Sequence, residues 1–248
     1  YSTKLREISK RILRTNENNI SLLINRKGLK KELSIPTFPI EEIDQYSYNN
    51  LQSNKILKDN VGYIFPGTIK NDEIKDIIDS FKQTKGLIID LRCYPSDFIV
   101  FSLGNYLVNK PTEFVKFSYT SHSHLGCFKY TEPQYVGDTT IQYNKKVAIL
   151  VNEETQSNAE YTAMSFEVSS NSKVFGSQTA GADGNVSEII LPGGMMTYIS
   201  GIGVYYPDGG ETQRVGVNVE SIVKPKINDI LMNKDIVLDQ AIKWINKN

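Results

Sequence analysis

The chain has 248 residues with 40% hydrophobic content, enough for one sizeable globular core or for one core with a small appendage. Lysine plus arginine and aspartate plus glutamate both number 28, so no net charge directs the chain to nucleic acid, to an anionic membrane or to an acidic polymer. No stretch approaches the roughly 18 to 20 apolar residues of a membrane span, which argues against a spanning helix within these residues.

Two cysteines, Cys93 and Cys127, are too few for a disulfide framework, and the sequence has no Cys-x-x-Cys motif or Cys/His cluster for zinc. We expect two isolated buried thiols, with a disulfide in an oxidising compartment as the alternative. The first residues, YSTKLREISKRIL, contain no methionine and no apolar stretch of the signal-peptide type. We interpret the sequence as a mature form or as part of a longer precursor.

The first third of the chain predicts small, separate elements. Apolar residues recur at helical spacing between residues 5 and 13, which predicts an amphipathic helix. Two strands are expected around residues 20–23 and 33–35, joined by a polar turn at Lys27 and Gly28. From about residue 40 to residue 60 the composition turns polar and loses its periodicity, which indicates a linker.

From residue 61 onward, strands and helices are predicted to alternate, as in βαβ units. The predicted strands lie at residues 61–66, 86–92 and 146–152, and residues 173–181 predict a short strand followed by a Gly-rich turn. The predicted helices lie at residues 74–81, at about 98–108 and at 159–166. The later residues predict β-hairpins with Gly-Gly and Asp-Gly turns, and then a closing helix near the end of the chain.

Ser157 stands where a predicted buried strand gives way to a predicted helix, in the segment NEETQSNAEYTAMSF. This position suits a nucleophile, because a rigid corner holds the hydroxyl and the N–H groups of the first helical turn point toward the space in front of it. It also suits a helix N-cap, since Ser157 followed by Glu160 matches the capping box S-x-x-E. The local pattern alone favours the cap.

Four segments of the chain occur in a characteristic order. Residues 61–64 read VGYI, residues 86–95 read GLIIDLRCYP, and residues 147–160 read VAILVNEETQSNAE. GSQTAG follows at residues 176–181, and after it come ILPGG and YYPDGGETQRVGV. Together these segments resemble the C-terminal processing (tail-specific) serine peptidases, over roughly residues 61–220. Any one segment is a weak signal, but four in register are a specific one.

The resemblance assigns roles residue by residue. Ser157 is similar to the nucleophile of the family segment T-A-S-A-A-E, and the N–H of Asn158 then becomes one donor of the oxyanion hole. The family takes its second donor from a Gly-Gly pair after D-L-R-x-N-P, and that pair falls here on Ser96 and Asp97. A backbone N–H does this work, so the changed side chains need not abolish the hole, although losing glycine restricts the backbone angles.

The general base departs from the family pattern. One branch pairs its serine with a lysine in T-x-G-K-G, but Ala182 occupies the lysine position, which excludes a Ser–Lys dyad. The chain looks closer to the tricorn-type branch, which uses serine, histidine and glutamate, with the histidine ahead of a PDZ domain. The two histidines of this chain, His122 and His124, match no family position for a base, so we expect surface residues. The resemblance therefore implies a histidine upstream of residue 1.

The third member of the tricorn-type triad is a glutamate three residues before the glycine of the Gly-Val block, and it aligns with Gln213. A glutamine can accept an N–H from imidazole and fix its tautomer, but it stabilises the imidazolium less than a carboxylate does. Gln213 is our first choice for the residue that orients the base, and Glu211 is the second. The alternative is that both are exposed hairpin residues.

Two further features receive structural interpretations. Asp90 and Arg92 come at the end of a predicted buried strand, and we expect them to form a charge-assisted pair that fixes the loop with the oxyanion donor. The glycine-rich run GADGN does not continue into a Lys-Ser/Thr helix start, which argues against a phosphate-binding loop.

The resemblance implies an α/β fold with a crotonase-like (Clp protease type) core, in which βαβ units form a spiralled sheet. Residues 1–38 would be the C-terminal part of a PDZ-like domain, residues 39–60 a linker and residues 61–248 the peptidase core. The implied function is that of a serine endopeptidase that hydrolyses unfolded or C-terminal polypeptide segments through an acyl-enzyme, without a cofactor or metal. Its implied location is the periplasm, the cell surface or the extracellular space, with the export signal upstream of residue 1.

Two other functions remain open. A catalytically inactive peptide-binding protein on the same fold would keep the core and lack the general base, as this sequence does. A crotonase-type acyl-CoA enzyme shares the core but normally needs acidic catalytic residues and a pair of oxyanion glycines, for which Ser157 would be an odd substitute.

Overall fold

The computed structural model describes residue 4 and residues 8–9, 11–43, 50–121, 123–124, 126–140 and 143–247. The predicted helix at residues 5–13 lies partly outside these residues. The strands are β1 (Asn19–Arg26), β2 (Leu29–Pro36), β3 (Asn54–Leu57), β4 (Val61–Ile64), β5 (Gly86–Asp90), β6 (Thr112–Thr120), β7 (Phe128–Tyr130), β8 (Gln134–Val136), β9 (Lys146–Val151), β10 (Ser172–Gly176), β11 (Val186–Ile190), β12 (Met196–Ser200), β13 (Gly203–Tyr205) and β14 (Ser221–Ile222). The α-helices are α2 (Ile74–Ser80), α3 (Val100–Leu107), α4 (Asn158–Glu167), α5 (Ile227–Leu231) and α6 (Ile236–Asn246), and short 3-10 helices lie at Ile40–Glu42, Lys58–Asn60, Pro66–Thr68 and Asn71–Glu73. None of the helices found in the described residues is long and apolar enough to cross a membrane.

A six-stranded sheet with the strand order β14-β10-β9-β5-β4-β3 forms the centre of the fold. Its strands run parallel, except that β3 pairs antiparallel with β4 at one edge. Neighbouring side chains of a strand point to opposite faces, so Leu87 and Ile89 of β5 enter one hydrophobic core and Ile88 enters the other. Strands that are buried on both faces are apolar throughout, which explains why the sequence reveals β5 and β9 so clearly.

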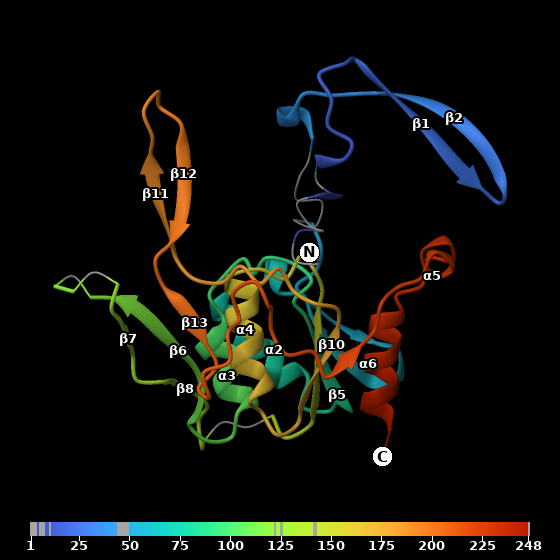
Figure 1. Ribbon diagram of the computed structural model, residues 1–248. Coiled ribbons are helices and arrows are strands. Elements are labelled where there is room, and N and C mark those ends of the chain that lie inside the picture. The colour runs from blue at the N-terminus through green and yellow to red at the C-terminus, as the bar shows by residue number, and fades with distance from the viewer. Residues whose placement is uncertain are drawn as a thin grey trace.

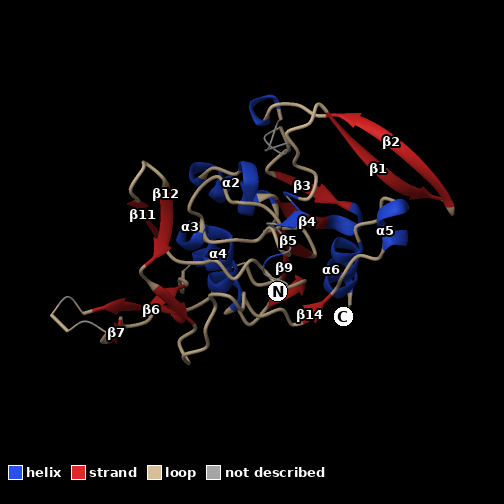
Figure 2. Cartoon of the chain, turned by 45° about the horizontal axis from the view of Figure 1, so that its top comes forward, coloured by secondary structure: helices blue, strands red, loops and turns tan. Residues whose placement is uncertain are grey.

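Helices cover both faces of this sheet (Figures 1 and 2). On one face, α2, α3 and α4 contribute residues such as Ile77, Leu103 and Phe166 to the larger core. On the other face, α6 packs Val237 and Ile242 against the sheet. The result is the α/β fold that the sequence predicts, with a mixed and mostly parallel sheet.

Two antiparallel parts extend this core. Strands β13, β6 and β7 form a second sheet, in which β8 also pairs with β6, and β6 contacts α4. The β11–β12 hairpin projects away from the body of the molecule, and its turn contains the Gly-Gly pair at Gly193 and Gly194 (Figure 1).

The N-terminal elements partly match the expectations. β1 and β2 form the predicted antiparallel hairpin around Lys27 and Gly28, and within the described residues this hairpin is a two-stranded sheet of its own. A single hairpin does not identify a PDZ domain, so that assignment stays a prediction. Strand β3 lies inside the stretch predicted as a linker, residues 39–60, yet it belongs to the central sheet.

The cysteines differ from each other. Cys93 is buried and Cys127 is exposed, and both are free thiols. The expectation of two buried thiols is therefore wrong for Cys127, which lies next to the exposed strand β7. Cys93 lies just after β5, where its Sγ donates a hydrogen bond to the Asp90 carbonyl at 3.4 Å.

Candidate active site

Three loops meet at the carboxyl edge of the central sheet. β10, β9 and β5 are parallel neighbours, so the loops that follow them emerge side by side. These loops are residues 91–97 after β5, residues 152–157 after β9 and residues 177–185 after β10. Thr155 joins all three, because its Oγ1 donates to the Leu91 carbonyl (2.7 Å) and its carbonyl accepts the N–H of Ala180 (3.0 Å).

Ser157 lies at the end of the middle loop, directly before α4, and has a φ of 53° and a ψ of −118°. An N-cap residue normally has β-region angles with negative φ, and a non-glycine residue at positive φ is strained. Its capping-box partner Glu160 is in place, but the backbone of Ser157 is not that of an ordinary cap. Strained residues concentrate at functional sites, and a sharp strand-to-helix turn presents the nucleophilic serine in another group of hydrolases.

The side chain of Glu160 fixes the turn at Ser157 through hydrogen bonds. The side chain is fully buried, and its Oε1 accepts hydrogen bonds from Thr179 Oγ1 (2.5 Å) and from the N–H of Gly181 (2.7 Å). Its Oε2 accepts the N–H groups of Ala182 (2.9 Å) and Ser157 (3.2 Å). Burial raises the pKa of Glu160, although these hydrogen bonds offset part of the effect. One carboxylate therefore ties the turn of Ser157 to the loop after β10, a role that the capping motif only hints at.

A cavity of about 640 Å³ opens beside Ser157. Five aromatic side chains line it, namely Tyr94, Phe98, Phe117, Tyr119 and Tyr161. The ring of Tyr161 on α4 stacks with Phe98 at 5.9 Å and with Phe117 at 6.1 Å between centroids. Concave, largely apolar sites with a few polar groups are typical binding sites for ligands and substrates.

The expected oxyanion donors have different surroundings. Asn158 is the first residue of α4 and lines the cavity, and the N–H groups of a first helical turn have no acceptor within their helix. The N–H of Ser96, in contrast, donates to the Pro66 carbonyl at 2.9 Å. Asp97 lies beside Asn158, whose Nδ2 is 3.5 Å from the Asp97 carbonyl, and the N–H of Asp97 has no hydrogen-bond partner in the described part of the chain. Of the two loop residues, only Asp97 has an N–H that is available.

Within the part of the chain that the structure describes, the cavity wall contains no base of the expected kind. Neither histidine nor lysine occurs among its lining residues, as far as the structure describes the chain. His124 is exposed, and its Nδ1 shares a hydrogen bond with Ser123 Oγ at 2.9 Å. His122 lies outside the described residues. Ala182 occupies the position of the family's lysine and contributes only its backbone to the Glu160 cluster.

The two candidates for an orienting residue also differ. Gln213 is half-buried, and its Nε2 donates to the carbonyls of Asp183 (2.9 Å) and Ile202 (2.8 Å), both of which line the cavity. Glu211 is exposed and lies 3.8 Å from the guanidinium of Arg214. Gln213 therefore adjoins the cavity, whereas Glu211 faces solvent.

Asp183 is a candidate that the sequence analysis missed. Asp183 is 7% exposed and lines the cavity, and its Oδ1 accepts the N–H of Gly184 at 2.7 Å. Its Oδ2 is buried and has no hydrogen-bond partner within the described residues. Burial raises the pKa of Asp183 to about 7, and the nearby Glu160 carboxylate acts in the same direction. The sequence shows an acidic residue in the GADGN turn, but not that this residue is buried in the wall of the cavity that Ser157 also lines.

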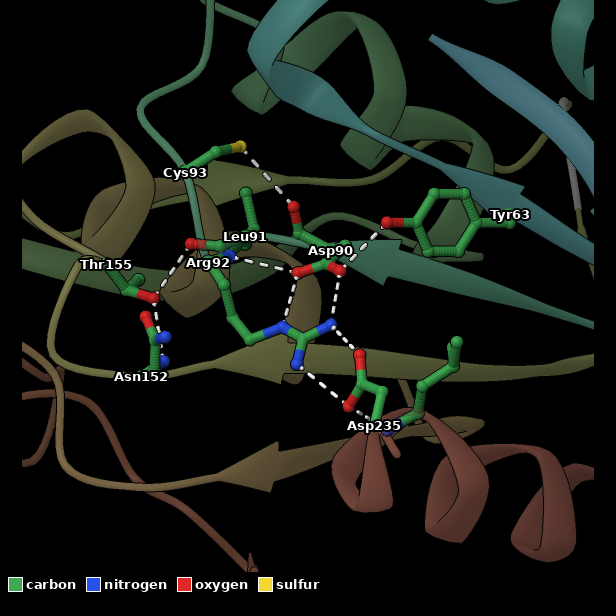
Figure 3. A network of polar contacts seen from close by, with 9 residues as sticks. Tyr63, Asp90, Leu91, Arg92, Cys93, Asn152, Thr155 and Asp235 are labelled. Carbon is green, nitrogen blue, oxygen red and sulfur yellow. Dashed lines mark hydrogen bonds and ion pairs between the residues drawn. The ribbon is translucent and has the colours of Figure 1, made fainter. Parts of the chain in front are cut away.

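The predicted pair between Asp90 and Arg92 is confirmed (Figure 3). Nε of Arg92 donates to Oδ1 of Asp90 at 2.8 Å, and Nη2 donates to Oδ2 at 2.6 Å. The same guanidinium binds Asp235 at the start of α6, at 3.0 and 2.7 Å, and the Tyr63 hydroxyl donates to Asp90 at 2.9 Å. Arg92 therefore fastens the beginning of the loop that contains Asp97 to both β5 and α6.

The model of peptidase family S41 matches residues 60–223. No curated protein matches the chain. Among solved structures, a candidate peptidase from Parabacteroides merdae is 19% identical, with a TM-score of 0.68 over 78% of this chain and 64% of its own.

Two further structures share the fold. Mature CPAF in complex with lactacystin is 15% identical, with a TM-score of 0.68 over 94% of this chain and 68% of its own. A photosystem II D1 C-terminal processing protease is 14% identical, with a TM-score of 0.54 over 84% of this chain and 56% of its own. The chain thus spans between 56% and 68% of the lengths of these three structures.

Proposed function

The chain belongs to peptidase family S41, and from this membership we propose that it is a serine endopeptidase with Ser157 as its nucleophile. The observation that carries the proposal is the backbone of Ser157, which has a φ of 53° at the start of α4 and lies in the wall of the aromatic cavity. A plain helix cap has no need of this strained geometry, whereas a nucleophile that must be presented to a substrate does.

The proposed reaction is acyl transfer. The Ser157 hydroxyl oxygen attacks the carbonyl carbon of a substrate peptide bond, and its proton passes to a general base. The N–H groups of Asn158 and Asp97 donate to the oxyanion that forms. The base then protonates the leaving amine, and a water molecule releases the acyl group from Ser157.

We propose a histidine as the general base, supplied by a part of the protein other than the described residues. Support comes from Ala182 at the lysine position and from the cavity wall, whose described residues include no imidazole or amine. Gln213 is the proposed orienting residue, since it binds two carbonyls of the cavity wall. Glu211 is the weaker choice because it is exposed.

The proposed substrate is an unfolded or C-terminal polypeptide segment, whose side chains the open aromatic cavity can accept. The family resemblance further supports three proposals: a spiralled, crotonase-like core of the tricorn-type branch, a PDZ-like region before residue 39, and a location outside the cytoplasm.

Hydrolysis of an unfolded protein tests the function. We expect the full-length wild-type protein to cleave reduced and alkylated casein, with new termini detected by mass spectrometry, and Ser157→Ala to cleave none. Ser187→Ala, an exposed serine of β11, is the matched control and should cleave like the wild type. Equal cleavage by Ser157→Ala would refute the proposal. A folded wild type that binds casein without cleaving it would favour the inactive peptide-binding protein.

A further inference from the structure

The wall of the cavity beside Ser157 contains a carboxyl group that has no partner of opposite charge among the described residues. Asp183 is the one charged side chain among the lining residues that the structure describes. Its Oδ2 is buried without a hydrogen-bond partner, and none of the ion pairs between described residues includes Asp183. A buried carboxylate without a partner of opposite charge is unfavourable. A cation placed in the cavity would supply a charge of opposite sign for this carboxylate.

The aromatic rim provides a second reason to expect a cation. Tyr94, Phe98 and Tyr119 are 50%, 52% and 45% exposed, so parts of their rings are free to contact a ligand. Aromatic faces attract ammonium and guanidinium groups, and the hydrocarbon stems of lysine and arginine pack on apolar surfaces. A neutral apolar side chain would satisfy the rings but would leave Asp183 unpaired, and an acidic side chain would be repelled.

We infer that this cavity is a subsite for a lysine or arginine side chain of the polypeptide substrate, and that Asp183 selects it. The inference rests on the proposed peptidase function and defines the substrate class of that site. Asp183 lies in the cavity wall with its Oδ2 below the surface. Its selectivity is therefore Coulombic, and it acts on the charge of the ligand more than on its shape.

Selection should depend on pH. On α4, Glu160 and Tyr161 interact electrostatically with Asp183, and both are acidic groups. The Gln213 amide binds the main chain of Asp183, not its carboxylate. Burial raises the pKa of Asp183 to about 7, so its carboxyl group is mostly protonated at pH 6 and mostly ionised at pH 8.5. Affinity for a cation should rise over this interval, and affinity for a neutral ligand should not.

Binding of two matched pentapeptides tests the inference. One has arginine at its centre and the other has citrulline, which has nearly the same shape but no charge, and alanine fills all other positions. Isothermal titration at pH 8.5 uses the Ser157→Ala protein, so that no peptide is cleaved. We expect the arginine peptide to bind about tenfold more tightly than the citrulline peptide, which corresponds to about 1.4 kcal/mol.

Adding Asp183→Asn to this protein should reduce the preference to within about twofold. The matched control is Asp76→Asn, on the exposed side of α2, which should leave the preference unchanged. If Asp183→Asn fails to fold, the pH series on the parent protein is decisive, because the preference should shrink at pH 6. Equal binding of both peptides at pH 8.5, a preference that survives Asp183→Asn, or no binding of either peptide would overturn the inference.

This outcome is separable from that of the proposed function. Peptide binding by the Ser157→Ala protein does not depend on catalysis. If the protein prefers the arginine peptide but cleaves no casein, the subsite is supported and the proposed peptidase function is refuted. If the protein cleaves casein but binds both peptides equally, the peptidase function is supported and the subsite is refuted.

Discussion

Replacing Glu160 tests how the turn that presents Ser157 is held. The carboxylate accepts one hydroxyl and three backbone N–H groups in a fully buried site. Two substitutions remove different numbers of these acceptors. Glu160→Gln keeps the shape and replaces one oxygen by an amide group, and Glu160→Ala removes both oxygens.

The magnitudes follow from the hydrogen-bond partners. With its oxygen at the Oε2 position, the glutamine still accepts from Ala182 and Ser157, and its amide can donate to Thr179 Oγ1. The N–H of Gly181 then faces a donor and loses its acceptor, which costs about 1–3 kcal/mol. Glu160→Ala leaves the N–H groups of Ser157, Gly181 and Ala182 without this acceptor, and of these three residues Gly181 is buried, Ser157 half-buried and Ala182 exposed. Water that enters the space offsets part of this loss, so we expect a destabilisation of about 3–5 kcal/mol.

Urea unfolding followed by circular dichroism measures these free energies. Glu188→Gln and Glu188→Ala are the matched controls, because Glu188 is exposed on β11, and each should lie within about 0.5 kcal/mol of the wild type. A second measurement is the rate at which a fluorophosphonate modifies Ser157. We expect Glu160→Gln to slow this reaction at least about tenfold, because a small displacement of a catalytic group is costly.

A Glu160→Ala protein as stable as its Glu188→Ala control would refute this reasoning. Stability that falls while the modification rate of Ser157 stays unchanged would show that Glu160 supports the fold but not the nucleophile.

Three further predictions concern the side chains of Asp183, Arg92 and His124. Folding raises the pKa of Asp183 from 3.8 to about 7, because the folded protein favours the protonated carboxyl group. The free energy of unfolding therefore does not suffer from Asp183 below pH 3.8, and it falls as the pH rises from 3.8 to about 7 and the buried group becomes charged. Asp183→Asn should therefore be nearly neutral at pH 4 and stabilising by about 2–4 kcal/mol at pH 8 in urea unfolding, and a destabilisation at pH 8 would contradict the burial argument. Arg92→Met should cost about 3–5 kcal/mol in the same assay because it leaves the buried Asp90 unpaired, and a loss below about 1 kcal/mol would contradict this account. His124→Ala should leave the modification rate of Ser157 unchanged, whereas a large decrease would identify His124 as the base.

The central strands were predictable because their signals are local. β5 and β9 are short apolar runs with a continuous buried pattern, and such runs are typical of parallel strands with both faces covered. The β11–β12 hairpin was predictable from the Gly-Gly pair in its turn, where both glycines have positive φ.

Other elements depend on contacts that the sequence does not reveal. β3 is an edge strand whose two middle residues are exposed, so its composition resembles that of a linker. The pairing of β13 with β6 joins residues 203–205 to residues 116–118, and no local pattern encodes a contact over that distance.

In the candidate site, too, some features were predictable from the sequence and others depend on tertiary contacts. The family resemblance pointed to Ser157 and Asn158, but it could not show the positive φ of Ser157, which separates a presented nucleophile from a simple cap. It also could not decide between Ser96 and Asp97, since that depends on the Pro66 carbonyl. The unpaired carboxylate of Asp183 arises from tertiary packing alone.

The central claim is that Ser157 is an activated nucleophile. The most direct test treats the folded, full-length protein with a fluorophosphonate probe near neutral pH and locates the modified residue by peptide mass spectrometry. We expect modification at Ser157 that disappears in Ser157→Ala and after denaturation. A folded wild-type protein that stays unmodified, or that is modified equally in Ser157→Ala, would contradict the central claim.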